Sequence, residues 1–177
     1  MNDPKQILDR LRALETDDIA ACDGRAFGYS YFAGDALDQL ARDAYAMYLS
    51  KNALDPRAFP SVSKLEHDVV AQVGSWMHLP SSGKATFTSG GTESILLAVK
   101  AARDQRKPAR RGNVVAPVTA HGAFRKAAEY LGLAFRASQV APSIYRCDAS
   151  TLEPLIDDDT IMLVAPLRST RTARSTT

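Results

Sequence analysis

The chain has few cysteines and no long apolar run. Cys22 and Cys147 are the only cysteines in 177 residues, and so sparse a set cannot form the disulfide framework of a small secreted domain. No stretch approaches the roughly 18 apolar residues of a membrane-spanning helix, and no apolar segment of the signal-peptide type follows Met1. These absences predict a soluble, cytoplasmic protein.

Two common phosphate-binding motifs and the usual metal motifs are also absent. A P-loop ending at Gly83 and Lys84 would need glycine at position 78, where the chain has histidine. The pattern G-x-G-x-x-G occurs nowhere, which excludes the dinucleotide-binding fingerprint. His67 and His78 lack the spacing of metal ligands, so we expect no metal site.

The charge balance gives no reason to expect a nucleic-acid partner. The chain carries 22 basic and 20 acidic residues, and three of the basic residues lie in the last thirteen, which leaves 19 against 20 in the rest. A second basic cluster has no interleaved aromatic residues and is predicted to be a solvated helix end and loop. Its members are Arg103, Arg106, Lys107, Arg110 and Arg111.

Residues 1–58 are predicted to form N-terminal helices and an aromatic, glycine-rich loop. Asp3 and Pro4 are typical of an N-cap and a first helical residue, and apolar residues at helical spacing follow them. Further helices are expected over 35–50 and, beyond this segment, over 62–76. The loop at 24–34 contains Tyr29 and Tyr31, for which surface packing and proximity to an active site both remain open.

From residue 85 onward, short apolar strands alternate with helices. Strands are expected at 85–88, 113–116, 133–137 and 160–164, and helices at 92–106, 121–131 and 150–156. This alternation is typical of a parallel α/β sheet, so the predicted fold class is α/β. Residues 165–177 have no apolar period and no acidic residue and are predicted to be disordered.

Residues 88–94, Thr-Ser-Gly-Gly-Thr-Glu-Ser, are the most informative stretch. A strand that turns through two glycines into a helix directs unpaired backbone N–H groups at one point, where the helix dipole also favours an anion. Gly90 and Gly91 carry no Cβ and allow close approach to the backbone, while Thr92 adds a hydroxyl donor. The pattern is suited to a phosphate, although an ordinary glycine turn before a helix has the same spacing.

Four segments in this order resemble the fold type I decarboxylase and lyase family, whose members depend on pyridoxal 5'-phosphate, and most of all its sphingosine-1-phosphate lyase branch. They are 59–66, 88–94, 119–128 and 152–164, and the resemblance covers about residues 24–164. It implies that residues 59–164 are an incomplete cofactor-binding large domain with a mostly parallel sheet. It also implies a homodimer, because active sites of the family form between two subunits.

The resemblance assigns roles to five residues. Gly91 and Thr92 would bind the cofactor phosphate, Ser89 and Gly90 would shape the loop, and His121 would stack on the pyridine ring. A helix N-terminal position without a ligand is the alternative for His121. Asp148 could be mistaken for the acidic partner of the ring nitrogen, but Ala149, Ser150 and a helix follow it, which favours an N-cap.

The family's Schiff-base lysine usually follows a histidine directly, and no His-Lys pair occurs in the chain. Lys84, Lys100 and Lys126 have no matching context. The resemblance therefore implies a carbon–carbon lyase by descent, acting on an amino acid or a phosphorylated amino alcohol, that is inactive as this fragment. The alternative is a non-catalytic module that at most binds phosphate weakly or associates with a subunit.

The resemblance also bears on the stability of the fragment. In this fold the sheet neighbours of strand 85–88 come later in the sequence, so the strand would lack them here. The fragment would then be marginally stable, prone to aggregate or dependent on a partner. A reading-frame shift near codon 165 would explain the Arg-, Thr- and Ser-rich tail, and the downstream DNA would test that hypothesis.

Overall fold

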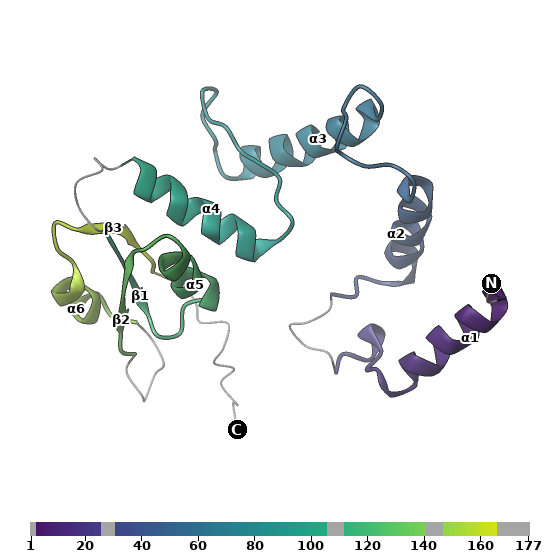
Figure 1. Cartoon of the computed structure of the whole chain (residues 1–177), viewed down its shortest axis with the longest axis horizontal. Coiled ribbons are helices and arrows are strands. Elements are labelled where there is room, and N and C mark those ends of the chain that lie inside the picture. Colours follow the sequence, from purple (N-terminus) through teal and green to yellow (C-terminus); the bar gives the residue numbers. More distant parts are fainter. Residues whose placement is uncertain (1–2, 26–30, 106–111, 141–146, 166–177) are drawn as a thin grey trace. The chain divides into compact units, whose positions relative to one another are not determined.

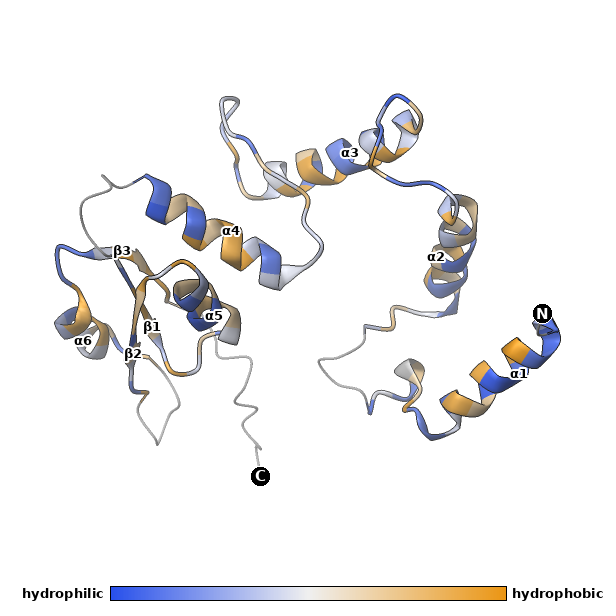
Figure 2. Ribbon diagram, in the orientation of Figure 1, coloured by the Kyte–Doolittle hydropathy of each residue, from blue (hydrophilic) through white to orange (hydrophobic). Residues whose placement is uncertain are grey.

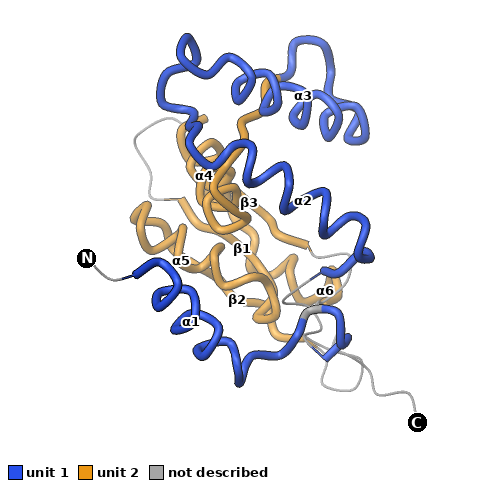
Figure 3. The backbone as a smooth tube through the Cα atoms, turned by 90° about the vertical axis from the view of Figure 1, so that its right-hand side faces the viewer, with its two compact units in different colours: residues 1–83 blue, residues 84–177 orange. Residues whose placement is uncertain are grey.

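The computed structural model describes residues 3–25, 31–105, 112–140 and 147–165. The chain divides into two compact units, residues 1–83 and 84–177 (Figure 3). The domain boundary expected at residue 59 lies inside the first unit. Tyr29, the basic residues from Arg106 to Arg111 and the tail from residue 166 lie outside the described residues.

The first unit consists of helices and their connections (Figure 1). Helix α1 spans Pro4–Leu14, two 3-10 turns follow at Glu15–Asp17 and Ala21–Asp23, and then come α2 (Asp35–Tyr48) and α3 (Pro60–Trp76). Helix α1 begins as predicted, because the Asp3 carboxylate accepts a hydrogen bond from the Lys5 N–H at 3.1 Å and Pro4 is the first helical residue. Helix α3 starts two residues earlier than expected, again with proline at its first position.

The three helices of this unit have no buried residue. Apolar residues recur along each helix, as the orange segments of the ribbon in Figure 2 show, and Leu40 on α2 and Trp76 on α3 are both more than half exposed. Amphipathic helices gain most of their stability by burying such a stripe. The apolar faces of α1, α2 and α3 are therefore not covered within this unit.

The second unit is a three-stranded parallel sheet flanked by helices. Its elements are α4 (Gly91–Asp104), β1 (Asn113–Pro117), α5 (Gly122–Tyr130), β2 (Ala134–Ser138), α6 (Ala149–Leu152) with a 3-10 turn at Glu153–Leu155, and β3 (Thr160–Leu163). The strand order is β2-β1-β3, and β1 pairs in parallel with both neighbours. The predicted parallel α/β architecture is confirmed.

The core of this unit lies between β1 and two helices. Val99 of α4, Val114 of β1 and Ala127 and Ala128 of α5 have no solvent exposure and pack together. Every residue of β1 is buried, as expected for a central strand with helices on both faces. Figures 1 and 3 show α5 and α6 on opposite faces of the sheet, the arrangement that right-handed crossovers in opposite directions produce.

Two glycines, Gly132 after α5 and Gly112 before β1, permit close connections in this unit. Helix α5 ends in a Schellman motif, in which Gly132 has a φ of 67° and the Leu133 N–H donates to the Ala128 carbonyl at 2.8 Å. Before β1, a Cβ on Gly112 would lie 2.7 Å from Ile161 Cγ2, so only glycine permits this close approach to β3.

The prediction of a strand at 85–88 is wrong. The structure shows no regular secondary structure there, and β1 pairs with β2 and β3 instead. A strand needs a partner for its backbone N–H and C=O groups, and none of the described strands lies beside this segment. The apolar run Ala85-Thr86-Phe87 thus has strand propensity without a sheet to join.

Candidate functional site

Residues 88–94, which we call the glycine loop, lead into the first turn of α4. Gly90 is the N-cap residue and Gly91 the first helical residue. Residues 89–94 are exposed and Thr88 is half-buried. No heavy atom lies within 4 Å of the position that a Cβ would take on Gly90 or Gly91, so the space in front of both glycines is open.

Three backbone N–H groups at this helix start have no acceptor among the described residues. The first helical bond of α4 runs from the Ser94 N–H to the Gly90 carbonyl at 3.1 Å, which leaves the N–H groups of Gly91, Thr92 and Glu93 without a bond. The Thr92 side chain is exposed beside them. This donor set, on the positive end of a helix dipole, suits an anion such as a phosphate monoester.

Side chains on both sides of the two glycines bridge to the helix. The Glu93 Oε2 atom accepts two hydrogen bonds from Ser89, from its N–H at 2.6 Å and from its hydroxyl at 2.7 Å. These two bonds, the side-chain one first, lower the pKa of the Glu93 carboxyl. The Thr88 hydroxyl lies 2.6 Å from the Ser94 hydroxyl. Both donors of Ser89 therefore bind Glu93, and the unbonded backbone N–H groups at the start of α4 remain available to a ligand.

His121 is the N-cap residue of α5. Its Nδ1 atom accepts a hydrogen bond from the Ala123 N–H at 3.1 Å, so the neutral ring carries its proton on Nε2. The side chain is exposed, and the ring face and Nε2 are not used by the cap. The helix-terminal placement was foreseen, but the capping bond was not, because histidine is an uncommon N-cap residue.

The structure brings the glycine loop and His121 to the same edge of the second unit. His121 follows β1 after a short turn, at the carboxyl end of that strand. Helix α4 packs against α5 and runs toward the amino end of β1, so its first residues lie toward the carboxyl end of that strand, as His121 does (Figure 1). In open α/β sheets ligands bind at the carboxyl ends of the strands, where the strand order reverses, and here β2 and β3 lie on opposite sides of β1.

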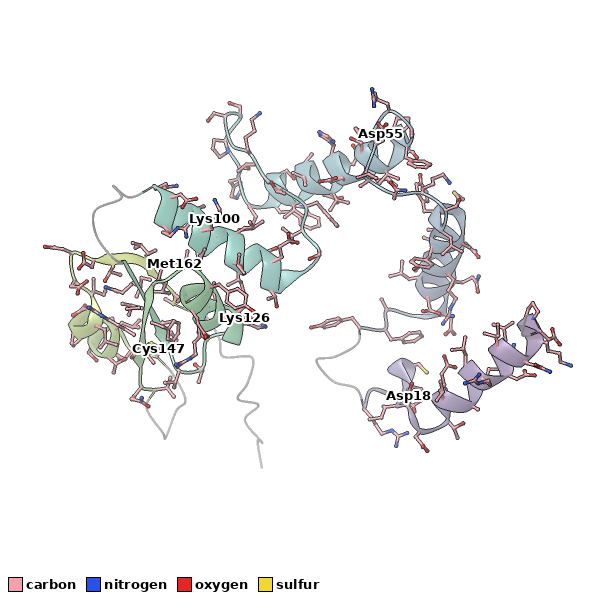
Figure 4. All side chains as sticks on the ribbon, viewed as in Figure 1. Asp18, Asp55, Lys100, Lys126, Cys147 and Met162 are labelled. Atoms are coloured by element: carbon pink, nitrogen blue, oxygen red, sulfur yellow. The ribbon has the colours of Figure 1, made fainter. Side chains whose placement is uncertain are left out.

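Three other residues named in the sequence analysis, Asp148, Lys100 and Lys126, interact with neighbours in the structure. Asp148 caps α6 by accepting from the Ser150 N–H at 2.9 Å, which confirms the N-cap interpretation. Lys100 pairs with Asp104, and the Lys126 ammonium lies 5.5 Å from the centre of the Tyr130 ring (Figure 4). Tyr31 is almost fully exposed. No group of three potential metal ligands occurs among the described residues.

Comparison with known proteins identifies relatives over most of the chain. No family model matches it. The sphingosine-1-phosphate lyase of Saccharomyces cerevisiae is 39% identical over 146 residues, which are 80% of this chain and 25% of the yeast protein. The probable L-aspartate decarboxylase of Halobacterium salinarum is 40% identical over 136 residues, or 76% of this chain and 37% of that protein.

A solved structure has the same fold. The sphingosine-1-phosphate lyase of Burkholderia pseudomallei superimposes with a TM-score of 0.73 and 27% identity, over 92% of this chain and 40% of that one. The chain belongs to the fold type I decarboxylase and lyase family. The glutamate decarboxylase of Lactobacillus brevis, with a TM-score of 0.67 and 18% identity, shares the fold.

Within this family, the lyase and decarboxylase relatives depend on pyridoxal 5'-phosphate. The chain spans 25% to 37% of the length of the two curated relatives compared above. What the family resemblance implied about fold and relatives is therefore confirmed. In the part of the chain that the structure describes, no helix has the length and apolar character to cross a membrane.

Proposed function

We propose that this chain carries the phosphate-binding part of a pyridoxal-phosphate-dependent carbon–carbon lyase. The observation that carries the proposal is the set of three unbonded N–H groups at the start of α4, in front of two exposed glycines with open space. Its relatives include sphingosine-1-phosphate lyases and amino acid decarboxylases, which supports this cofactor over other phosphate esters.

The residues present fit the cofactor in distinct ways. Gly91 and Thr92 bind the phosphate through their N–H groups and the Thr92 hydroxyl, and Gly90 lets the anion approach the backbone. Ser89 shapes the loop through its bonds to Glu93. His121 presents its ring face for stacking on the pyridine. When bound, the cofactor supplies an electron sink for carbanion chemistry.

The substrate we propose is a small amine, either an amino acid or a phosphorylated amino alcohol. The relatives support both a decarboxylation and a retro-aldol cleavage, since decarboxylases and sphingosine-1-phosphate lyases match similar shares of the chain. The two reactions would use the same phosphate site. We propose no nucleic-acid partner, and the sparse cysteines support a cytoplasmic location.

The 177 residues contain no histidine followed directly by lysine. We therefore propose that these residues bind the cofactor phosphate without completing the reaction by themselves. A second candidate function is a non-catalytic module for phosphate binding or subunit association. The uncovered apolar faces of α1, α2 and α3 favour association, and a homodimer is the form we propose.

A Gly91→Pro variant tests the phosphate site. Proline at the first helical position removes one N–H donor and is compatible with a helix, as Pro4 and Pro60 show in this chain. We expect pyridoxine 5'-phosphate, which cannot form an imine, to shift the amide signals of residues 91–93 in the 15N NMR spectrum of the wild-type chain. Loss of a hydrogen bond to a charged group should weaken binding about tenfold or more.

Ala149→Pro is the matched control, because Ala149 is the first residue of α6 and the change removes an N–H group of the same kind. It should leave the affinity unchanged. Pyridoxine without its phosphate should not shift residues 91–93. Equal affinity of the two proline variants, or equal shifts with both ligands, would refute a phosphate site at this loop.

A further inference from the structure

The glycine loop is held in shape by very few contacts. No neighbouring atom lies within 4 Å of the Cβ positions of Gly90 or Gly91, so no side chain fills the space that a Cβ would take on either glycine. Glycine loses more conformational freedom on ordering than any other residue. A loop with two adjacent glycines needs bonds from its flanking residues to keep one conformation.

Two side-chain bridges supply those bonds. In the first bridge, the Thr88 hydroxyl forms a hydrogen bond with the Ser94 hydroxyl at 2.6 Å and donates to the Gly90 carbonyl at 3.2 Å. In the second bridge, a single carboxylate oxygen of Glu93 accepts hydrogen bonds from the Ser89 N–H and the Ser89 hydroxyl, at 2.6 and 2.7 Å. The second bridge is the stronger, since hydrogen bonds to a charged acceptor are about twice as strong as neutral ones.

The position of Glu93 also decides which amides remain free. Glu93 is the third residue of α4, where a carboxylate can reach back to the residues before the helix, as in a capping box. It satisfies the N–H of Ser89, and not those of Gly91 and Thr92. The bridge therefore orders the loop while the donors that face the open space stay available.

We propose that Glu93, acting through Ser89, is the positioning residue that holds the glycine loop in the shape that receives the phosphate. The inference rests on the proposed function for the identity of the anion. Glu93 itself makes no contact with the anion. Its negative charge close to the site opposes a phosphate dianion, so its contribution is made through the geometry of the loop.

Two substitutions separate geometry from charge. In Glu93→Gln the amide oxygen has two lone pairs and can accept both Ser89 donors, so the loop keeps its shape and loses the repelling charge. In Glu93→Ala the bridge is absent. We expect pyridoxine 5'-phosphate to bind Glu93→Gln at least as tightly as wild type, and Glu93→Ala about tenfold more weakly because two bonds to a charged group are lost.

Ser89→Ala and the double variant Ser89→Ala/Glu93→Ala test whether the effect passes through Ser89. Residues that act through one interaction give non-additive effects, so Ser89→Ala should weaken binding in the wild-type background and change little when Glu93 is already alanine. Additive losses of affinity, or a Glu93→Gln variant that binds pyridoxine 5'-phosphate as weakly as Glu93→Ala does, would overturn the proposal.

A ligand-free measurement keeps this inference distinct from the proposed function. In the 15N NMR relaxation of the free full-length chain, the amides of Gly90 and Gly91 should become more mobile in Glu93→Ala and remain rigid in Glu93→Gln. Equal rigidity in all variants would refute the positioning role. If wild type binds no phosphate ester, the proposed function fails, while the mobility result still decides the role of Glu93.

Discussion

Asp157, three residues before β3, links side chains of β1 and β2 through one carboxylate. Its Oδ1 atom accepts from the Asn113 side chain at 2.8 Å, and its Oδ2 atom pairs with Arg136 at 2.6 Å. The Asn113 hydrogen bond is the largest cause that lowers the pKa of Asp157 to about 2, and the Arg136 hydrogen bond contributes further. Asn113 begins β1, Arg136 lies in β2 and Asp157 precedes β3, so this side chain helps to set the register of the sheet.

An Asp157→Asn substitution should lower the midpoint of thermal unfolding at pH 7. The pKa in the folded state is below that of an unfolded Asp, about 3.9, so the ionised group stabilises the fold above about pH 4 and this contribution is lost as the pH falls toward 2. Thermal melts between pH 2 and 7 should therefore show a steeper acid loss in wild type than in the variant. Asp158→Asn, at the exposed neighbouring position, is the matched control. Parallel acid profiles of wild type and Asp157→Asn would contradict the prediction.

Helices α4 and α5 place their first residues at the carboxyl edge of the sheet by different means. Helix α4 starts with two glycines and is tied by Glu93, whereas α5 starts with a histidine whose own ring caps it. The ring of His121 therefore has two tasks in our proposal, since Nδ1 holds the helix start and the ring face stacks on the cofactor. The orientation of the ring is set by the helix that it begins.

The two tasks of His121 can be separated by substitution. Asparagine is a good N-cap residue, so His121→Asn should keep the stability of the chain and weaken pyridoxine 5'-phosphate binding, because the stacking ring is lost. His121→Ala loses both the N-cap and the stacking ring, and its free energy of unfolding should fall by about 1 kcal/mol. Urea unfolding and the same NMR titration measure the two effects. Undiminished binding by His121→Asn would argue against stacking.

Most helices and strands with a strong local signal in the sequence, an apolar run or an N-cap residue, were predicted correctly. The strand predicted at 113–116 from its apolar run is the central strand Asn113–Pro117, whose residues are all buried. The starts of α1 and α6 were predicted from the N-cap residues Asp3 and Asp148. The strand at 85–88 was predicted wrongly, because propensity does not reveal whether a partner strand is present. Glu93 was missed as a loop partner, since its spacing of four from Ser89 differs from the usual capping-box spacing of three.

The two units of the molecule differ in how much apolar surface they bury. The second unit has a core between β1, α4 and α5, while α1, α2 and α3 in the first unit bury no residue. Isolated helices of this length are marginal in water. Local stability should therefore be unevenly distributed along the chain.

Hydrogen–deuterium exchange measured by mass spectrometry should show this difference directly. At a chain concentration low enough to prevent association, peptides from α1, α2 and α3 should exchange rapidly, and those from β1 should be strongly protected. Raising the concentration should slow exchange in the three helices if the proposed homodimer covers their apolar faces. Equally slow exchange in both units at low concentration would contradict the uneven distribution.

The position of β1 at the centre of the sheet has a consequence for synthesis. Both of its partners, β2 and β3, come later in the chain. At roughly 5–20 residues per second, the ribosome exposes this strand, which is fully buried in the folded chain, for some seconds before Ala134 and then Thr160 emerge to pair with it. During that interval the nascent chain offers two free strand edges, so its yield in the cell should depend on the supply of chaperones that shield such edges.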